Sequence, residues 1–90
     1  MHYPQMNELK FSMRTVNLLK KEGISNLPQL LMLGREGLMH LRGCGSRVLD
    51  DVESVIGESG LKLPKHSLRF ASMEELRSIE IVARYRNQVS

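Results

Sequence analysis

The sequence contains few cysteine and aromatic residues, and its histidines are not clustered. These absences exclude a fold held by intrachain disulfides and argue against a zinc site. Its single cysteine, Cys44, excludes an intrachain disulfide, and no Cys-x-x-Cys pair is present. The three histidines, His2, His40 and His66, are scattered, so no zinc-site spacing can be assembled. With no Trp, two Phe and two Tyr in 90 residues, a core must be built from Leu, Ile, Val and Met. That composition favours helices over strands.

Long apolar runs and catalytic residue patterns are also missing. No stretch approaches the roughly 20 apolar residues that span a bilayer. The N-terminal segment MHYPQMNELK has no apolar region of the kind found in signal peptides. These absences predict a cytoplasmic protein with no membrane partner. Paired carboxylates at catalytic spacing and a nucleophile with its base are lacking too, so we expect neither an enzyme nor a cofactor. Asp50 and Asp51 would point about 100° apart on a helix, so we expect a solvated face there.

Charge is distributed unevenly along the sequence. Residues 1–49 carry seven basic and three acidic side chains, a net charge of +4. Residues 50–58 carry four acidic side chains and no basic one, a net charge of −4. A basic half next to an acidic helix is typical of an ordinary solvated surface or of an oriented anion-binding face. The charge distribution does not distinguish a solvated surface from an anion-binding face, so the distinction depends on the sequence motifs.

Apolar periodicity and cap residues predict short helices and no strand of useful length. Ser and Asn residues mark the helix starts, and glycines mark the ends. The expected helices lie within residues 12–23, 26–34, 35–41, 46–60 and 72–87. The last one opens with Ser72 and Glu75, which have the spacing of a capping box. Its apolar stripe is narrow, so we expect it to dock only modestly: Leu76, Ile79, Val82 and Ala83.

The stretch LRGCGSRVLDDV, residues 41–52, contains two glycines directly before a helix. Gly43 and Gly45 would let the backbone turn sharply through positive φ. A helix that starts near Ser46 has unpaired N–H groups at its first turn, and Arg47 adds positive charge there. Together these groups make a site for a phosphate. A glycine pair between helices is also often no more than a tight turn, and Cys44 between them fits an inward apolar position better than a nucleophile.

The order of these segments resembles a known family. ELKFSMRTVNLLKKEGI, LPQLL, GCGSRVLDDV and GLKL, between about Glu8 and Leu63, are similar to the C-terminal domain of the bacterial RNA polymerase alpha subunit. The resemblance implies a compact bundle of short helices. With the apolar periodicity, the predicted fold is all-α: a compact bundle of four short helices with a helix-hairpin-helix motif, plus a C-terminal helix that the family normally lacks. We expect the family-like domain over residues 1–66 and a C-terminal helical extension over residues 67–90. The sequence fits a separate small protein and a piece of a longer polypeptide equally.

The resemblance also assigns site residues. The family's DNA-contacting arginine and asparagine fall on Arg14 and Asn17, its hairpin glycine on Gly45, and a basic residue of the last long helix on Arg47. With the turn residues of the hairpin, the predicted DNA-binding set is Arg14, Asn17, Gly43, Gly45, Ser46 and Arg47. Two family side chains are changed, because Gly43 stands where Asn is usual and Val48 where Ser or Thr is usual.

A second set of residues would serve protein docking. Of two acidic positions that contact sigma factor in the family, one is kept as Glu8 and the other is reversed to Lys10. The sequence therefore predicts a non-enzymatic, transcription-associated domain that binds AT-rich DNA through the minor groove. RNA polymerase, sigma factor and activators are the expected protein partners. Two alternatives stay open: a docking module on the same fold without DNA binding, and a helix-hairpin-helix accessory domain in DNA repair.

Overall fold

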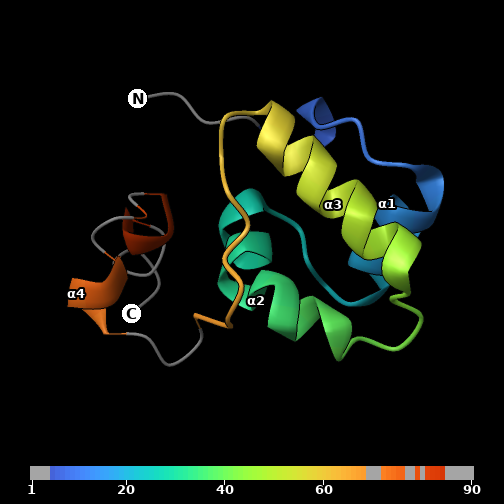
Figure 1. Cartoon of the computed structure of the whole chain (residues 1–90). Helices are drawn as coiled ribbons and strands as arrows, with labels where there is room; N and C mark the ends of the chain where they lie inside the picture. The colour runs from blue at the N-terminus through green and yellow to red at the C-terminus, as the bar shows by residue number, and fades with distance from the viewer. Residues whose placement is uncertain (1–4, 69–71, 77–78, 80, 85–90) are drawn as a thin grey trace.

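The computed structural model describes residues 5–68, 72–76, 79 and 81–84, and its regular secondary structure there is helical (Figure 1). No strand occurs within these ranges. The all-α prediction is therefore confirmed. The elements are a 3-10 turn η1 (Met6–Glu8), α1 (Met13–Lys21), α2 (Leu27–Met39), α3 (Ser46–Glu58) and α4 (Met73–Leu76), with residues 81–84 helical as well.

Local signals set both ends of α1, as the sequence predicts. Ser12 is the extended N-cap residue, and its Oγ accepts a hydrogen bond from the backbone N–H of Thr15. At the other end, Gly23 adopts a φ of 75°. The N–H of Ile24 then reaches back to the carbonyl of Leu19 at 2.9 Å, which turns the backbone and buries Ile24.

Helix α2 is broken in the middle by Gly34, which has φ 66° and ψ 179°. The break confirms the prediction that one helix ends at Gly34 and another follows. Beyond the break, the N–H groups of Arg35 and Glu36 donate to the carbonyls of Pro64 and Lys65 at 2.7 and 2.9 Å. The segment 61–68 therefore crosses α2 at its break, and we call this segment the strap. A Cβ atom at Gly34 would come within 2.5 Å of a strap carbonyl oxygen, so only glycine fits there.

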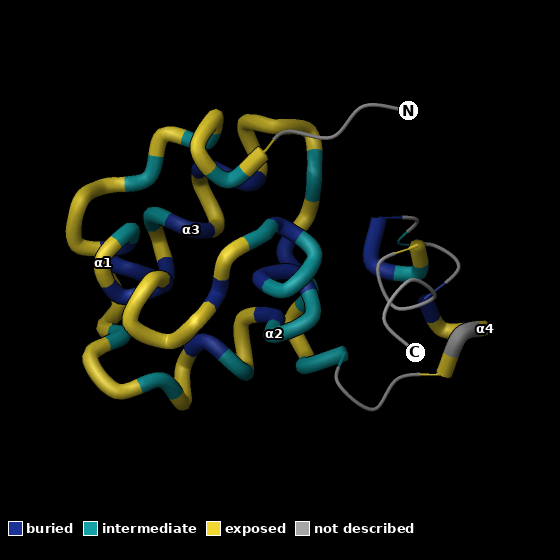
Figure 2. The backbone as a smooth tube through the Cα atoms, turned by 180° about the vertical axis from the view of Figure 1, so that it is seen from behind, coloured by how far each residue is buried: buried dark blue, intermediate teal, exposed yellow. Residues whose placement is uncertain are grey.

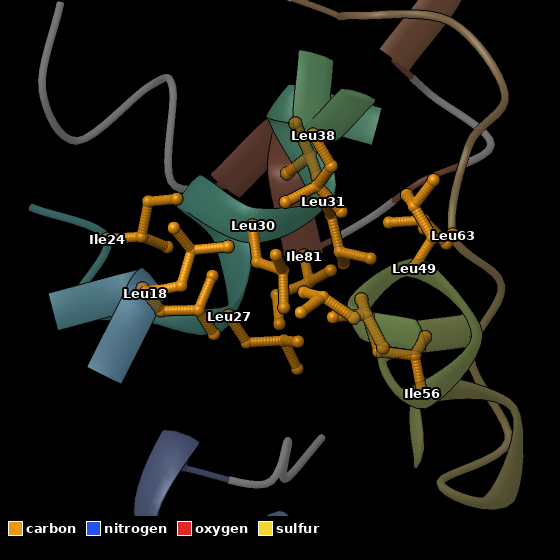
Figure 3. Packing of buried hydrophobic residues seen from close by; sticks show 14 of the residues in the cluster. Leu18, Ile24, Leu27, Leu30, Leu31, Leu38, Leu49, Ile56, Leu63 and Ile81 are labelled. Carbon is orange, nitrogen blue, oxygen red and sulfur yellow. The ribbon is translucent and has the colours of Figure 1, made fainter. Parts of the chain in front are cut away.

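The core lies between α1, α2 and α3, as the distribution of buried residues along the backbone shows (Figure 2). The predicted apolar face of α3 is confirmed, since all of its members are buried: Val48, Leu49, Val52, Val55 and Ile56. The same core includes Leu76, Ile81 and Val82 from the C-terminal segment, and Figure 3 shows Ile81 among side chains of the longer helices.

The prediction of one continuous helix over residues 72–87 is wrong within the described residues. Ser72 does cap α4, because its Oγ accepts the N–H of Glu75 at 3.2 Å. Helix α4 ends at Leu76, and Ile79 is not helical. The N–H of Ile79 bonds to the carbonyl of Leu76 at 2.8 Å, and the carbonyl of Ile79 accepts from Val82 at 3.1 Å and from Ala83 at 3.0 Å. One helical turn therefore ends at Ile79, and the next helical turn begins there.

Burial explains the break. On a straight helix Leu76 and Ile81 would point about 140° apart, so one face could not bury both. The interruption lets Leu76, Ile81 and Val82 enter one core, with Leu76 and Val82 at 0% exposure. The docking is deeper than the narrow stripe predicts. Residues 85–87, where the predicted helix would end, lie outside the described residues.

Candidate nucleic-acid interface

The glycine hairpin joins α2 to α3 through one residue in the left-handed region. Gly43 has a φ of 89°, and the N–H of Cys44 bonds to the carbonyl of Leu41 at 3.1 Å. Gly45 has φ −93° and ψ −176°, an extended conformation that any residue adopts. The predicted positive φ is therefore confirmed at Gly43 and wrong at Gly45. The backbone has already reversed its direction at Gly43. Gly45 therefore needs no special conformation and serves as the extended N-cap residue of α3.

Open space surrounds the start of α3. A Cβ atom at Gly45 would meet nothing within 4 Å, and the helix start has no hydrogen bond from a capping side group. Ser46 and Arg47, the next two residues, are both exposed. The first N–H groups of α3 therefore face an open surface with a mobile positive charge beside it, which is the arrangement that accepts an anion.

Helices α1 and α3 lie side by side and bring two predicted DNA-binding arginines to one place (Figure 1). Arg14 and Arg47 both line a shallow hollow of about 380 Å³, together with Ser12, Val48 and Asp51. Arg14 is exposed on the first turn of α1. Residues distant in sequence thus form one basic site.

The other predicted DNA-binding residues flank this hollow. Asn17 is exposed on α1, three residues after Arg14, which places the two side chains on neighbouring positions of the helix surface. A Cβ atom at Gly43 would lie 3.8 Å from Cδ1 of Leu18, so the hairpin leans on α1 beside Asn17. The hairpin and α1 therefore lie close together at this point.

The two departures from the family pattern affect this surface differently. Val48 is buried, with 2% of its surface exposed, so it packs in the core and offers no hydroxyl to a ligand. Gly43 is exposed and contributes only backbone. Neither position therefore presents a polar side chain, and the exposed arginines and backbone N–H groups are available to bind an anion.

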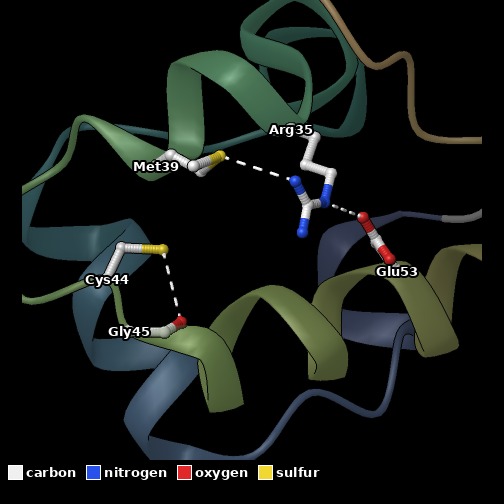
Figure 4. A network of polar contacts seen from close by, with 5 residues as sticks. All are labelled: Arg35, Met39, Cys44, Gly45 and Glu53. Carbon is white, nitrogen blue, oxygen red and sulfur yellow. Dashed lines mark hydrogen bonds and ion pairs between the residues drawn. The ribbon is translucent and has the colours of Figure 1, made fainter.

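Cys44 has a structural position. It is partly buried against the core, and burial raises the pKa of its thiol, which disfavours the thiolate. Its Sγ lies 4.0 Å from the carbonyl oxygen of Gly45 (Figure 4). Between the same two helices, Arg35 of α2 pairs with Glu53 of α3, with 2.8 Å between Nε and Oε1. Both of these side chains are about half exposed, so the ion pair adds little stability, and the shared apolar core holds α2 and α3 together.

The predicted docking residues lie on a different segment. Glu8 ends η1, and Lys10 follows two residues later; both are exposed, and partly buried Leu9 separates them. Neither residue lines the hollow that holds Arg14 and Arg47. The structure therefore does not bring the two predicted sets of site residues together in one hollow.

Asp51 is a member of the site that the sequence did not indicate. Instead of lying on a fully solvated face, it is half-buried, and its Oδ2 accepts a hydrogen bond from the backbone N–H of Ser12 at 3.0 Å. A contact between residues 39 positions apart leaves no local signal in the sequence. Asp51 also lies in a helix with several other acidic residues, so its residue type does not indicate the contact with Ser12.

Within the described ranges, no three His, Cys, Asp or Glu residues are grouped so that they could hold a metal ion. In the same ranges, the helices are too short and too polar to cross a bilayer.

The short helices, the glycine hairpin and the exposed start of α3 define an all-α domain of the helix-hairpin-helix class. A family profile for the C-terminal domain of the bacterial RNA polymerase alpha subunit matches residues 2–58, and this protein belongs to that family. The resemblance seen in the sequence is thereby confirmed. The family makes this a transcription-associated domain.

Relatives in several bacteria support the assignment. The protein is 38% identical over 58 residues to the DNA-directed RNA polymerase subunit alpha of Clavibacter michiganensis subsp. michiganensis. It is 36% identical over the same length to the subunits of Leifsonia xyli subsp. xyli and Moorella thermoacetica. Each match covers 64% of this sequence and 18% of the relative, so the matched region spans about a fifth of the length of these subunits. The strap and the C-terminal segment lie beyond the profile match.

Proposed function

We propose that this protein is a non-enzymatic domain that binds AT-rich DNA through the minor groove and the phosphate backbone. The observation that carries the proposal is the hollow where Arg14 of α1 and Arg47 of α3 meet, beside a helix start without a capping hydrogen bond from any side group. The set of contact residues is the one predicted from the sequence: Arg14, Asn17, Gly43, Gly45, Ser46 and Arg47.

Each part of the surface has a physical task in this proposal. A narrow AT-rich minor groove concentrates negative potential, and a guanidinium group enters it more readily than a strongly hydrated ammonium group. Arg14 is the side chain for that task. The first N–H groups of α3 and the charge of Arg47 hold a phosphate. Gly45 leaves room for the phosphate to approach, since no atom of the protein stands where its Cβ would be.

Protein partners belong to the same proposal. The alpha-subunit relatives favour association with RNA polymerase, and activators or sigma factor would dock on the exposed lead-in that carries Glu8 and Lys10. Because Lys10 reverses one of the expected acidic charges, we expect this contact to differ from that of the family. A cytoplasmic location follows from such partners.

Titration with DNA tests the proposal. The protein is mixed with an AT-rich and a GC-rich duplex of equal length, and the amide resonances of residues 14–17 and 43–48 are followed by NMR at several salt concentrations. We expect these resonances to shift with the AT-rich duplex at lower concentration, and the affinity to fall steeply with salt because phosphate contacts release counterions.

The alternative is a docking module on the same fold, without DNA binding. The loss of polar side chains at Gly43 and at buried Val48 is the observation that favours it. Equal, weak responses to both duplexes would select this alternative, as would binding to a polymerase partner that changes little with salt.

A further inference from the structure

An apolar groove lies between helix α1 and the segment that precedes it, residues 5–11, which we call the lead-in (Figure 1). The volume of this lead-in groove is about 490 Å³, inside the range of roughly 300–1,000 Å³ that accommodates small organic molecules. In the described part of the chain, no residue lines both this groove and the basic hollow. The apolar lining residues are Met6, Leu9, Phe11, Val16, Leu19 and Ile24.

Helix α1 supplies one wall and the floor of the groove. Val16, Leu19 and Lys20 stand at i, i+3 and i+4, so they share one face of the helix. Leu19 and Ile24 are core residues with 2% and 8% of their surface exposed, and they form the floor. Val16 is half-buried beside them. The helical period therefore places Lys20 at the edge of an apolar surface.

The lead-in supplies the opposite wall. Leu9 is extended, and side chains on extended backbone alternate between two sides. Leu9 and Phe11 accordingly face the core and are half-buried, whereas Lys10 between them is exposed. Phe11 is the only Phe, Tyr or Trp in the part of the chain that the structure describes. An aromatic ring thus adds a large apolar surface to this wall.

Apolar contacts alone hold the lead-in against α1. Its backbone bonds stay within the segment, from the N–H of Glu8 to the carbonyl of Gln5 at 2.9 Å and from the N–H of Leu9 to the carbonyl of Met6 at 3.2 Å. Among the described residues, no hydrogen bond joins residues 5–11 to α1. Apolar contacts are not directional, so this wall can adjust its distance from α1 when a molecule enters.

The charge at the groove is positive and has no counterion from the protein. Lys20 is the only charged residue in the described lining. Within the described ranges, the ion pairs join α2 to α3 and α2 to the strap, so no carboxylate neutralises Lys20. Four charged residues close in sequence do not line the groove: Glu8, Lys10, Lys21 and Glu22. An anionic group therefore complements the edge of this apolar surface.

The C-terminal end of a helix normally opposes an anion, because its last carbonyls carry partial negative charge. At the end of α1, the carbonyls of Leu18, Leu19 and Lys20 accept hydrogen bonds at 2.9–3.1 Å from the N–H groups of the following turn. Lys20 and Lys21 also place two positive charges in the last turn. This end of α1 is therefore compatible with a bound anion.

We propose that the lead-in groove binds a small molecule with an apolar body and one carboxylate, such as a medium-chain fatty acid. The body lies against Leu19 and Phe11, and the carboxylate pairs with Lys20. The part of α1 that lines the groove, Val16 to Lys20, is little more than one helical turn, whereas a docked partner helix needs anchors over about two turns. The groove therefore fits a small molecule better than a helix. The inference does not depend on DNA binding.

Three probes separate the apolar body from the charge. Octanoate, 1-octanol and butyrate are titrated below micelle formation, and the amide resonances of residues 6–11 and 16–25 are followed by NMR. We expect saturable shifts of these resonances with octanoate, and none with butyrate at the same concentrations, since each buried CH₂ group is worth about fourfold in affinity. Octanoate shifts that spread equally over α3 and the strap, or equal responses to octanoate and butyrate, would overturn the proposal.

Two neighbouring lysines give matched variants. Lys20 and Lys21 are both exposed, but only Lys20 lines the groove. Lys20→Gln should weaken octanoate binding roughly two- to fivefold, the size of an exposed ion pair, and should leave 1-octanol binding unchanged. Lys21→Gln should bind both probes like the wild type. Equal losses of octanoate affinity in the two variants would show an effect of overall charge and would contradict a carboxylate site at Lys20.

Other occupants give different results. Shifts of the groove resonances with protein concentration alone would assign the groove to a second copy of this protein. Shifts with a polymerase partner, but none with octanoate, would assign it to protein docking. Either result would overturn the proposal. Protein saturated with octanoate should bind an AT-rich duplex like the free protein, and failure of the free protein to bind DNA would overturn the proposed function alone.

Discussion

The region that matches the family, residues 2–58, and the region beyond it build one core in different ways. Helices α1, α2 and α3 have 9 to 13 residues, and α1 and α2 each start at a residue whose side group caps the helix. The region beyond has a strap and short helical turns, whose apolar residues Leu76 and Val82 are fully buried. Helices as short as α4 are not stable alone, so contacts with the core must hold that region in place. Local signals thus organise most of the first region, whereas the second region, although Ser72 caps α4, depends mainly on tertiary contacts.

The largest effect should come from deleting residues 70–90. The deletion removes Leu76, Ile81 and Val82 from the core. Each buried side chain of this size contributes about 1.5–3 kcal/mol, and three of them approach the whole stability of a small domain. We expect cooperative thermal unfolding, followed by circular dichroism, to be lost. A truncated protein that melts like the full one would separate the two regions and support the division into a 1–66 domain and a 67–90 extension.

The next largest effect should come from Gly34→Ala, which changes the residue of α2 that the strap crosses, where the two regions are in contact. Gly34 has a positive φ, and a Cβ there would come within 2.5 Å of the carbonyl oxygen of His66 in the strap. Backbone strain together with displacement of the strap should lower the free energy of unfolding by about 2–4 kcal/mol. Urea unfolding measures the change.

Gly57→Ala is the matched control for this substitution. Gly57 lies inside α3 with open space around its Cβ position, so the change should raise stability by up to about 1 kcal/mol. Similar effects of the two substitutions would mean that the strap does not cross α2 at Gly34.

Arg14→Ala tests whether DNA binding depends on the first region, residues 2–58, alone. We expect a loss of about 1–3 kcal/mol in affinity for an AT-rich duplex, as for one good groove contact, with little change in melting temperature. Arg14→Lys should recover part of the loss. The control is Lys62→Ala in the strap, which does not line the basic hollow and should bind like the wild type. An equal loss for Lys62→Ala would place DNA contacts on both regions.

The smallest effects should distinguish the two hairpin glycines. Gly43→Ala should reduce stability by about 1–2 kcal/mol, because Gly43 has a φ of 89°. Gly45→Ala should reduce it by no more than about 1 kcal/mol, because Gly45 is already extended. The new methyl group of Gly45→Ala would nevertheless stand where a phosphate approaches, so its duplex affinity should fall. Melting curves and titrations of both variants test this separation; a larger stability loss for Gly45→Ala would contradict it.

The residues that sequence reasoning located correctly are those with short-range causes. Ser12 caps α1, Asn26 caps α2 by accepting the N–H of Gln29, and Gly23 ends α1. All three act within one turn of their own positions, and the apolar period of α3 is visible in the sequence itself. Three features were missed or wrong because distant residues decide them. Asp51 bonds to Ser12, the conformation of Gly45 depends on where Gly43 has already turned the backbone, and the break at Ile79 exists because Leu76 and Ile81 share one core.

The burial of Leu76, Ile81 and Val82 also has a consequence for the newly made protein. Synthesis runs from the N-terminus, so residues 2–58 leave the ribosome before these three side chains do, and the hairpin and α3 emerge with the core cluster incomplete. During that interval the nascent polypeptide keeps apolar surface in contact with water. Surface of this kind is what chaperones and neighbouring nascent polypeptides bind. The order of synthesis therefore makes the growing polypeptide most vulnerable just before its C-terminal segment arrives.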